Sequence, residues 1–321
     1  MGKKKILLVF VAIILLPAFP IHASEIYELF EPDESGPYHV GYYKAKYNDP
    51  VYGDYTAAIR YPAKYDGFFA PKINSDTPFP GIVVANGFAG SEWQIKWIPT
   101  HLTTYGYVTI CFTPPNKTSG DTTQWAYGFV RGIQKLKSHN SMWFSPISGI
   151  LDTETFGAIG LSMGGGGCIE ATGLPDSEID ASVALAPANS DSSINAAQNI
   201  TVPIQIQVGN NDGMVPPERV LPYYSDLIPD TLNKEYFSIT GGNHIGFIDD
   251  FFARFAENLG LDYPKEIEFE EQRKISSKYF TAWFEYHLRG LDEYFTYIFG
   301  KDAQNDFDAG MLSDLRYMYS D

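Results

Sequence analysis

Short apolar runs alternate with longer amphipathic stretches along most of the chain. Seven runs predict β-strands, at residues 56–61, 81–85, 107–112, 156–161, 181–186, 203–208 and 235–239. Several are continuously apolar, which is typical of strands buried on both faces. The intervening stretches predict helices at 91–105, 122–138, 163–172, 217–228 and 271–289. This alternation predicts an α/β fold with a mostly parallel central sheet covered by helices on both faces.

Two details complete this pattern. Pro99 lies inside the first predicted helix and is expected to kink or restart it. Gly290 is expected to end the last helix.

Residues 25–50 are rich in tyrosine and predict irregular structure before the sheet begins.

The N-terminus has the layout of a secretory signal peptide. Three lysines at positions 3–5 precede an uninterrupted apolar run at 6–16, and Pro17 and Pro20 follow it. Cleavage after Ala23 or Ser24 would remove residues 1–24 and leave residues 25–321 as one exported catalytic domain. The alternative is an uncleaved membrane anchor, although the run is shorter than the roughly 20 residues that span a bilayer.

Charge and cysteine content narrow the possible partners. Removal of three lysines from 23 basic residues leaves 20 against 39 acidic residues. Such an acidic chain is not expected to bind nucleic acid or an anionic membrane, and it favours a neutral or weakly polar substrate. Cys111 and Cys168 lie in apolar surroundings and are expected to be buried and unpaired, with a disulfide as the alternative. The histidines show no metal-ligand spacing, so we expect neither a metal nor a cofactor.

Gly160-Leu161-Ser162-Met163-Gly164 is the pattern of a nucleophile elbow. Glycines allow a strand to turn sharply into a helix while the serine adopts a strained backbone conformation. The pattern here follows a predicted strand and precedes a predicted helix, as the elbow requires. Ser162 is therefore the expected nucleophile, and the alternative is an idle serine in a glycine-rich turn.

The acid and the base are expected on loops after later strands, because catalytic groups of parallel sheets gather at the carboxyl ends of strands. Asp212 directly follows the strand at 203–208, whereas Asp226 and Asp230 lie within or beyond the next helix. His244 follows the strand at 235–239. The other histidines lie in the signal peptide, ahead of the sheet, in or beside helices, or on the last helix: His22, His39, His101, His139 and His287.

These residues predict acyl transfer by a serine nucleophile. His244 would take the proton of Ser162, and Asp212 would hold the imidazole in the required tautomer. The developing oxyanion needs two backbone donors, and we expect them to be the N–H groups of Met163 and Phe88, the latter in the turn after the strand at 81–85.

At these motifs the sequence resembles the cutinase-like polyester hydrolases and the related platelet-activating-factor acetylhydrolase-like and dienelactone-hydrolase-like groups of the α/β-hydrolase fold. The matching segments are Gly36-Pro37-Tyr38, GIVVANGFAG, the helix with Trp97, TYGYVTI, GLSMGGGG, NNDGMVPP, GGNHIGF and YFTAWFEYHL, and the resemblance runs from about residue 36 to residue 290. The resemblance implies a secreted serine esterase that cleaves small or polymeric carboxylic esters, including polyesters, as a monomer without stable membrane association. It implies the same triad of Ser162, Asp212 and His244 and the same oxyanion donors.

The resemblance also suggests substrate contacts. Phe88 would pack on the acyl group, Met214 would line an aliphatic pocket, and Ile245 would lie on its rim. Trp93, close to the predicted oxyanion turn, is a further candidate. Ala188 stands where the polyester hydrolases usually carry a tryptophan. This difference is expected to affect activity on aromatic polyesters and not ester hydrolysis itself.

Two further departures concern the elbow and the segment after the base. Leu161 replaces the usual histidine or tryptophan of the elbow, which should change packing only. The segment at 246–272 is longer than in compact cutinases and carries Phe247, Phe251, Phe252 and Phe255. It is expected to form either a lid or pocket wall, or an ordinary surface helix.

Two alternative functions remain at this point. A peptidase or amidase of the same fold would normally need a propeller or cap domain, for which 321 residues leave little room. A binding protein on an inactive hydrolase scaffold would be expected to lack one triad member, and all three are present in the order used by the fold.

Overall fold

A ten-stranded mixed sheet organises residues 30–320, the part of the chain that the computed structural model describes. The strand order is β10-β9-β8-β7-β6-β4-β5-β2-β1-β3. The six strands β5, β4, β6, β7, β8 and β9 pair in parallel with one another. At one side β2 pairs antiparallel with β5 and with β1, and β1 pairs in parallel with the short β3; at the other side β10 pairs antiparallel with β9. The predicted mostly parallel sheet is therefore confirmed.

The strands have the following bounds: β1 (His39–Asp49), β2 (Gly53–Ala63), β3 (Gly67–Phe68), β4 (Phe79–Ala85), β5 (Val108–Thr113), β6 (Leu151–Leu161), β7 (Ala181–Leu185), β8 (Ile204–Gly209), β9 (Lys234–Ile239) and β10 (Leu312–Met318). The helices are α1 (Trp97–Thr104), α2 (Thr123–Ser141), α3 (Met163–Thr172), α4 (Asp191–Ala197), α5 (Pro217–Pro222), α6 (Asp250–Asn258), α7 (Phe269–Arg289), α8 (Phe295–Ile298) and α9 (Lys301–Asp308), with short turns η1 (Glu92–Ile95), η2 (Tyr223–Leu227), η3 (Ile245–Phe247) and η4 (Asp292–Tyr294).

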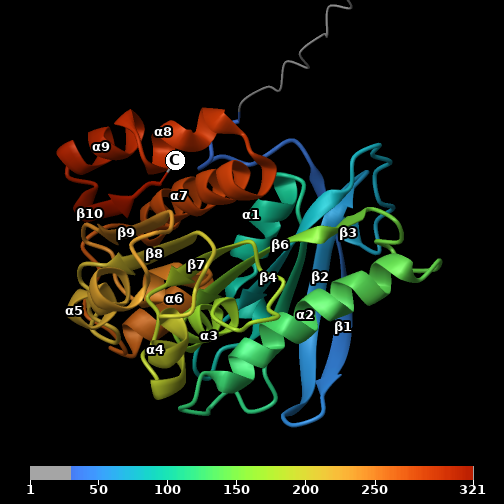
Figure 1. The fold of residues 1–321 in the computed structure, drawn as a ribbon, viewed down its shortest axis with the longest axis horizontal. Helices are drawn as coiled ribbons and strands as arrows, with labels where there is room; N and C mark the ends of the chain where they lie inside the picture. The colour runs from blue at the N-terminus through green and yellow to red at the C-terminus, as the bar shows by residue number, and fades with distance from the viewer. Residues whose placement is uncertain (1–29, 321) are drawn as a thin grey trace, which may run out of the picture.

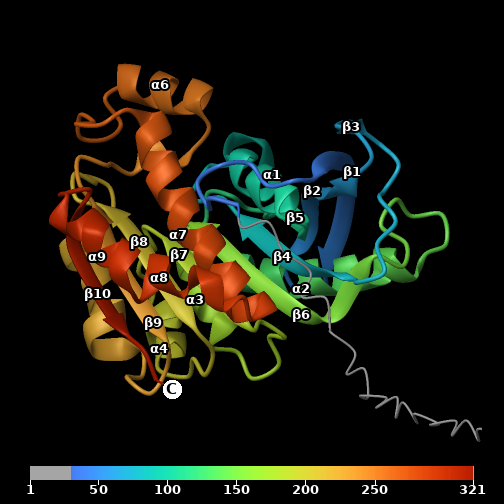
Figure 2. The ribbon, with the colours of Figure 1, turned by 90° about the horizontal axis from the view of Figure 1, so that it is seen from above.

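Helices cover both faces of the sheet, as predicted. Figures 1 and 2 show α1 and α7 on one face and α2 and α3 on the other. Alternate residues of β4 point to opposite faces, so Ile82 and Val84 join the core with α1 and α7, while Val83 and Ala85 join the core with α2. Burial on both faces explains why this strand is apolar throughout.

Most of the segment that looked irregular is instead a long strand, β1, next to the edge of the sheet. Eleven residues of β1 pair with β2 in continuous antiparallel register, from His39 opposite Ala63 to Asp49 opposite Gly53. Tyr43, Ala45 and Tyr47 face inward, and the lysines between them face solvent. The prediction of irregular structure was wrong here because alternating tyrosine and lysine form no apolar run, although period-two alternation is the pattern of a half-buried strand.

Helix boundaries also differ from expectation at Pro99. The break falls at Lys96, where η1 ends and α1 begins. Pro99 lies in the first turn of α1, where its missing N–H breaks no intrahelical hydrogen bond. Gly290 ends α7 with φ of 66°, as predicted.

Both cysteines are buried and free, Cys111 on β5 and Cys168 on α3. The expectation of two unpaired, buried cysteines is confirmed and the disulfide alternative is wrong. Within residues 30–320, none of the helices combines the length and the apolar character needed to cross a membrane. The predicted signal peptide at 1–24 lies outside the described residues.

Candidate active site

Ser162 occupies a strained turn between β6 and α3. Its φ of 57° and ψ of −118° lie in a region that side chains other than glycine rarely adopt. Three backbone hydrogen bonds hold it there: its N–H donates to Leu185, and its carbonyl accepts from Gly166 and Ala188, each at 2.9 Å. A conformation that costs about 1–3 kcal/mol persists only where its surroundings enforce it, and these bonds do so.

The glycines of the elbow allow three backbone segments to meet. A Cβ at Gly160 would lie 2.1 Å from the carbonyl oxygen of Gly164, and one at Gly164 would lie 2.6 Å from that of Ala85 on β4. A Cβ at Gly87, in the turn after β4, would lie 2.5 Å from the Cβ of Ser162. These positions therefore require glycine, and the turn after β4 lies directly against Ser162.

Asp212 and His244 come together on two neighbouring loops, which we name the acid loop (residues 210–216, after β8) and the base loop (residues 240–245, after β9). Asp212 Oδ2 lies 2.7 Å from His244 Nδ1, and both side chains are buried. The other carboxylate oxygen accepts the backbone N–H groups of Met214 and Val215 at 2.9 and 2.6 Å. The aspartate is thus held by its own loop and leaves one oxygen for the imidazole.

The pKa of His244 reflects opposing effects. Burial lowers it, because the charged imidazolium loses its hydration. The carboxylates of Asp212 and Asp262 raise it, since they favour the imidazolium. The net result is a pKa above the ordinary value of 6.5. A histidine in this environment can accept a proton and hold it in contact with a carboxylate.

The two predicted oxyanion donors belong to backbone segments next to Ser162. Met163 is the first residue of α3, where backbone N–H groups have no partner within the helix. Phe88 lies in the turn after β4, which is fastened by Trp125 Nε1 donating to the carbonyl of Asn86 at 2.8 Å and by the N–H of Ala89 donating to Lys117. Their role as oxyanion donors stays a prediction.

The predicted substrate contacts divide into two groups. Phe88, Trp93 and Met214 expose 56%, 49% and 47% of their surface, which leaves them accessible to a substrate. Ala188 is half-buried, and its N–H donates to Ser162. Ile245 is buried and packs with residues of α6 and with Phe269, so its apolar contacts are with the protein core.

The segment after His244 forms helix α6, which stands at one end of the molecule in Figure 2. It docks against η1: Phe252 meets Trp93 edge-to-face with ring centroids 4.4 Å apart, and the N–H of Asp249 donates to Gln94 at 2.8 Å. Phe251 and Phe255 are exposed. The segment 246–272 contains a helix, and its contact with Trp93 places it beside the predicted substrate residues. The lid or pocket wall stays a prediction, as does the alternative of an ordinary surface helix.

Sequence reasoning missed three residues that contact the triad loops. Asp262 accepts hydrogen bonds from backbone N–H groups of both loops. In the base loop, the N–H of Asn243 donates to Gln272 Oε1, and Gln272 Nε2 donates to the carbonyl of Asn243. Nothing local in the sequence indicates these pairs, because their partners lie up to 49 residues away.

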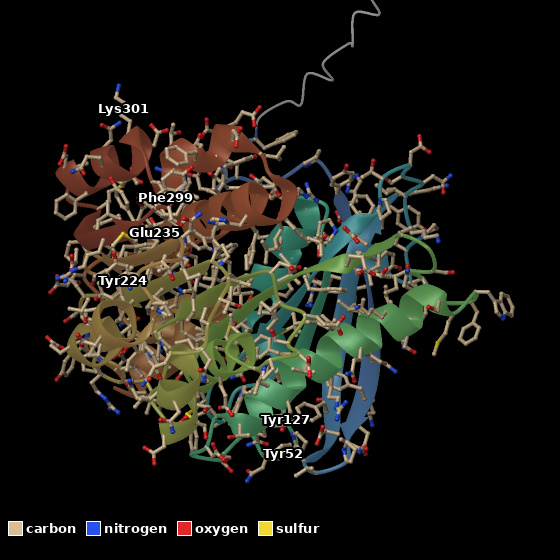
Figure 3. All side chains as sticks on the ribbon, viewed as in Figure 1. Tyr52, Tyr127, Tyr224, Glu235, Phe299 and Lys301 are labelled. Carbon is tan, nitrogen blue, oxygen red and sulfur yellow. The ribbon has the colours of Figure 1, made fainter. Side chains whose placement is uncertain are left out.

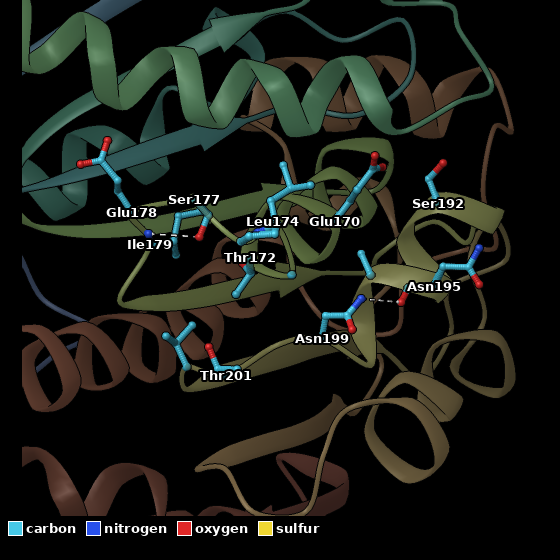
Figure 4. A pocket seen from close by; sticks show the side chains of 14 residues that line it. Glu170, Thr172, Leu174, Ser177, Glu178, Ile179, Ser192, Asn195, Asn199 and Thr201 are labelled. Atoms are coloured by element: carbon cyan, nitrogen blue, oxygen red, sulfur yellow. Dashed lines mark hydrogen bonds between the residues drawn. The ribbon is translucent and has the colours of Figure 1, made fainter.

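Two cavities lie away from these residues. One, of about 780 Å³, is lined by the end of α3, the following loop and α4, and includes Glu170 and Asn199 (Figure 4). The other, of about 540 Å³, lies between the N-terminal segment and the end of α7 and includes Tyr105 and Arg289. Neither is lined by a predicted triad residue. Over the described residues, no three His, Cys, Asp or Glu side chains gather in a way that could hold a metal ion.

Comparison with known proteins identifies the family of the chain. The family model described as PETase, PET hydrolase-like, matches residues 51–256, about two thirds of the chain. The chain belongs to this family, so the predicted family and its α/β-hydrolase fold are confirmed. A bis(hydroxyethyl) terephthalate hydrolase of Streptomyces coelicolor is 29% identical over 178 residues, which are 55% of this chain and 54% of the relative. The chain thus spans about half the length of that curated relative.

Proposed function

We propose that this protein is a secreted serine hydrolase of carboxylic esters that works through an acyl-enzyme. The observation that carries the proposal is the buried contact of 2.7 Å between His244 Nδ1 and Asp212 Oδ2, at the same sheet edge as the strained Ser162. Membership of the PET hydrolase-like family supports ester chemistry.

The geometry suggests how each group acts. His244 Nε2 takes the proton from Ser162 as the serine oxygen attacks the acyl carbon, and Asp212 stabilises the imidazolium that forms. The oxyanion accepts the N–H groups of Phe88 and Met163, and loss of one such donor typically costs about 10²–10³ in rate. The leaving alcohol receives the proton from His244. Water then attacks the acyl-enzyme, with His244 again the base and Ser162 the leaving group.

The surroundings favour a neutral, apolar substrate. Phe88, Trp93 and Met214 present exposed apolar surface next to the triad loops and the oxyanion turn. The formal net charge of −16 disfavours anionic substrates. The Streptomyces relative is named for a terephthalate diester, so we propose that neutral aromatic diesters are substrates together with small aliphatic esters. Ala188 provides no second ring against an aromatic acyl group, and activity on polyester films should be weaker than on soluble diesters.

Hydrolysis of a p-nitrophenyl ester series from acetate to palmitate, with bis(hydroxyethyl) terephthalate and a polyester film alongside, tests the proposal. Ser162→Ala should abolish turnover of every ester while the folded protein keeps its melting temperature. Turnover that survives this substitution, or a folded wild type without activity on any ester, would contradict it. Export is tested separately by N-terminal sequencing of protein from the culture medium, which should begin at Ser24 or Glu25.

A further inference from the structure

The loop between α6 and α7, residues 259–268, lies against both the acid loop and the base loop. Asp262, half-buried within it, contacts the two at once. One carboxylate oxygen accepts the N–H of Gly213 at 2.8 Å, and the other accepts the N–H of Ile245 at 3.2 Å. Gly213 directly follows Asp212, and Ile245 directly follows His244. A single carboxylate therefore bridges the backbone next to both residues.

Further contacts attach the α6–α7 loop to the acid and base loops at several points. The side-chain amide of Asn211 donates to the carbonyl of Pro264, and that of Asn243 donates to the carbonyl of Tyr263 at 2.8 Å. The ring of Tyr263 covers Gly213 so closely that a Cβ there would lie 2.8 Å from it. The residues before and after Asp212 are thus held by the same loop that holds the base loop.

The acid and base loops extend beyond the last paired residues of β8 and β9. Two hydrogen bonds already link them there, from the N–H of Asn211 to the carbonyl of Gly242 at 2.9 Å and from the N–H of Gly241 to Asn210 Oδ1 at 2.7 Å. Asp262 adds a link directly beside Asp212 and His244. Hydrogen bonds from backbone N–H groups to an ionised carboxylate are shorter and about twice as strong as neutral ones. A misplacement of about 1 Å at a catalytic group can cost about 10²-fold in rate. A bridge between the loops therefore bears directly on the His244–Asp212 geometry.

We propose that Asp262 is a positioning residue of the catalytic triad, whose carboxylate ties the acid loop to the base loop and adds a second negative charge beside His244. This inference rests on the proposed function. The charge agrees with the raised pKa of His244, on which Asp212 and Asp262 are the two acting carboxylates.

Asp262→Asn tests both parts of the role. The amide keeps one acceptor oxygen and loses the charge, so kcat should fall by about 10- to 100-fold with KM within about twofold of wild type. The acid limb of kcat/KM should move to lower pH, because the imidazolium loses a stabilising charge.

Asp262→Glu keeps the charge and misplaces the carboxylate, so it should lower kcat and leave the acid limb near its wild-type position. Glu270→Gln, an exposed acid in the first turn of α7, removes one charge as a control and should change neither.

Two readouts do not depend on ester turnover. Amide hydrogen exchange should show lost protection at Gly213 or Ile245 in Asp262→Asn, and side-chain ¹⁵N NMR should show a lower pKa of His244. If the wild type hydrolyses no ester, the proposed function fails and these two readouts still decide the role of Asp262. A folded Asp262→Asn protein with wild-type kcat, acid limb, amide protection and His244 pKa would overturn the inference.

Discussion

At the scale of single residues, the candidate site depends on backbone conformations that only certain residues allow. Ser162 has a positive φ, enforced by its hydrogen bonds to Leu185, Gly166 and Ala188. Gly87 leaves space for it from the opposite side. The position of the serine oxygen is therefore set by the absence of side chains around it as much as by its own loop.

Gly87→Ala should reduce kcat by about 10²-fold, because a Cβ 2.5 Å from the Cβ of Ser162 must displace either the serine or the oxyanion turn. The measurement is kcat on p-nitrophenyl acetate. Gly120→Ala, where an added Cβ meets nothing within 4 Å, is the matched control and should behave as wild type. Equal rates for the two variants would show that the close approach has no catalytic consequence.

The pH dependence should follow the protonation of His244. The imidazole acts as a base only when neutral, and its pKa lies above 6.5 because Asp212 and Asp262 outweigh burial. Activity should therefore fall as pH decreases through a midpoint above 6.5, which a pH profile of kcat/KM measures. A midpoint below 6.5 would contradict this assignment.

Asp212→Asn should lower kcat by about 10⁴-fold, because the amide no longer holds the imidazole in the required tautomer. The measurement is kcat on p-nitrophenyl acetate, with circular dichroism to establish that the variant is folded. A loss of less than tenfold would indicate that another carboxylate serves the histidine.

At the scale of elements, α3 and α6 are helices that tertiary packing stabilises. In α3 this packing outweighs a low intrinsic helix propensity. Four successive glycines follow Met163 in α3, and each destabilises a helix by about 1 kcal/mol relative to alanine. Every residue of α3 is buried, and burial against β6, β7 and α2 stabilises it. Helix α6 is held differently. Its Ala253 and Ala256 pack against Ile245 of η3, and Phe252 near its start contacts Trp93.

Phe252→Ala should release Trp93 and affect large substrates more than small ones. An edge-to-face aromatic pair is worth about 0.5–1.5 kcal/mol, so KM for bis(hydroxyethyl) terephthalate should rise by about 2- to 10-fold. KM for p-nitrophenyl acetate should stay close to wild type. Phe255→Ala removes an exposed ring of the same helix as a control. An equal change for both substrates would mean that α6 does not shape the substrate site.

At the scale of the whole molecule, a buried polar chain joins the sheet to α7. Glu235 on β9, labelled in Figure 3, accepts from Gln205 at 2.6 Å, and Gln205 accepts from Gln207, which in turn accepts from Ser276 on α7. Burial raises the pKa of Glu235 well above its usual value, and the hydrogen bond from Gln205 opposes this only in part. The native state therefore holds a proton that the unfolded chain releases near pH 4.5.

The sign of the stability effect follows from linkage. The folded state binds more protons than the unfolded state above about pH 4.5, so stability decreases as pH rises from there towards the raised pKa. Glu235→Gln keeps an acceptor for Gln205 and removes this dependence. Its Tm should match wild type near pH 4.5 and exceed it at pH 8 by about 2–4 °C, the shift that about 1 kcal/mol produces in a large domain. Parallel loss of Tm in Glu235→Gln and wild type would contradict this, with Glu270→Gln as the exposed control.

The sequence alone determined the features that depend on local backbone and on strand order. The glycine elbow identified Ser162, and the positions of Asp212 and His244 after successive strands placed them at one sheet edge, where the structure brings them within hydrogen-bonding distance. Continuous apolar runs predicted the central strands because those strands are buried on both faces. Their chemical roles remain predictions for the experiments above.

Only the tertiary structure decided the elements and contacts that depend on distant partners. The outer strands β1 and β10 carry alternating or polar patterns, and they become strands by pairing with β2 and β9. The bridge from Asp262 to Gly213 and Ile245 joins segments separated by up to 49 residues. An aspartate in a loop has many possible partners in a sequence, and only the folded chain brings the N–H groups of Gly213 and Ile245 to this carboxylate.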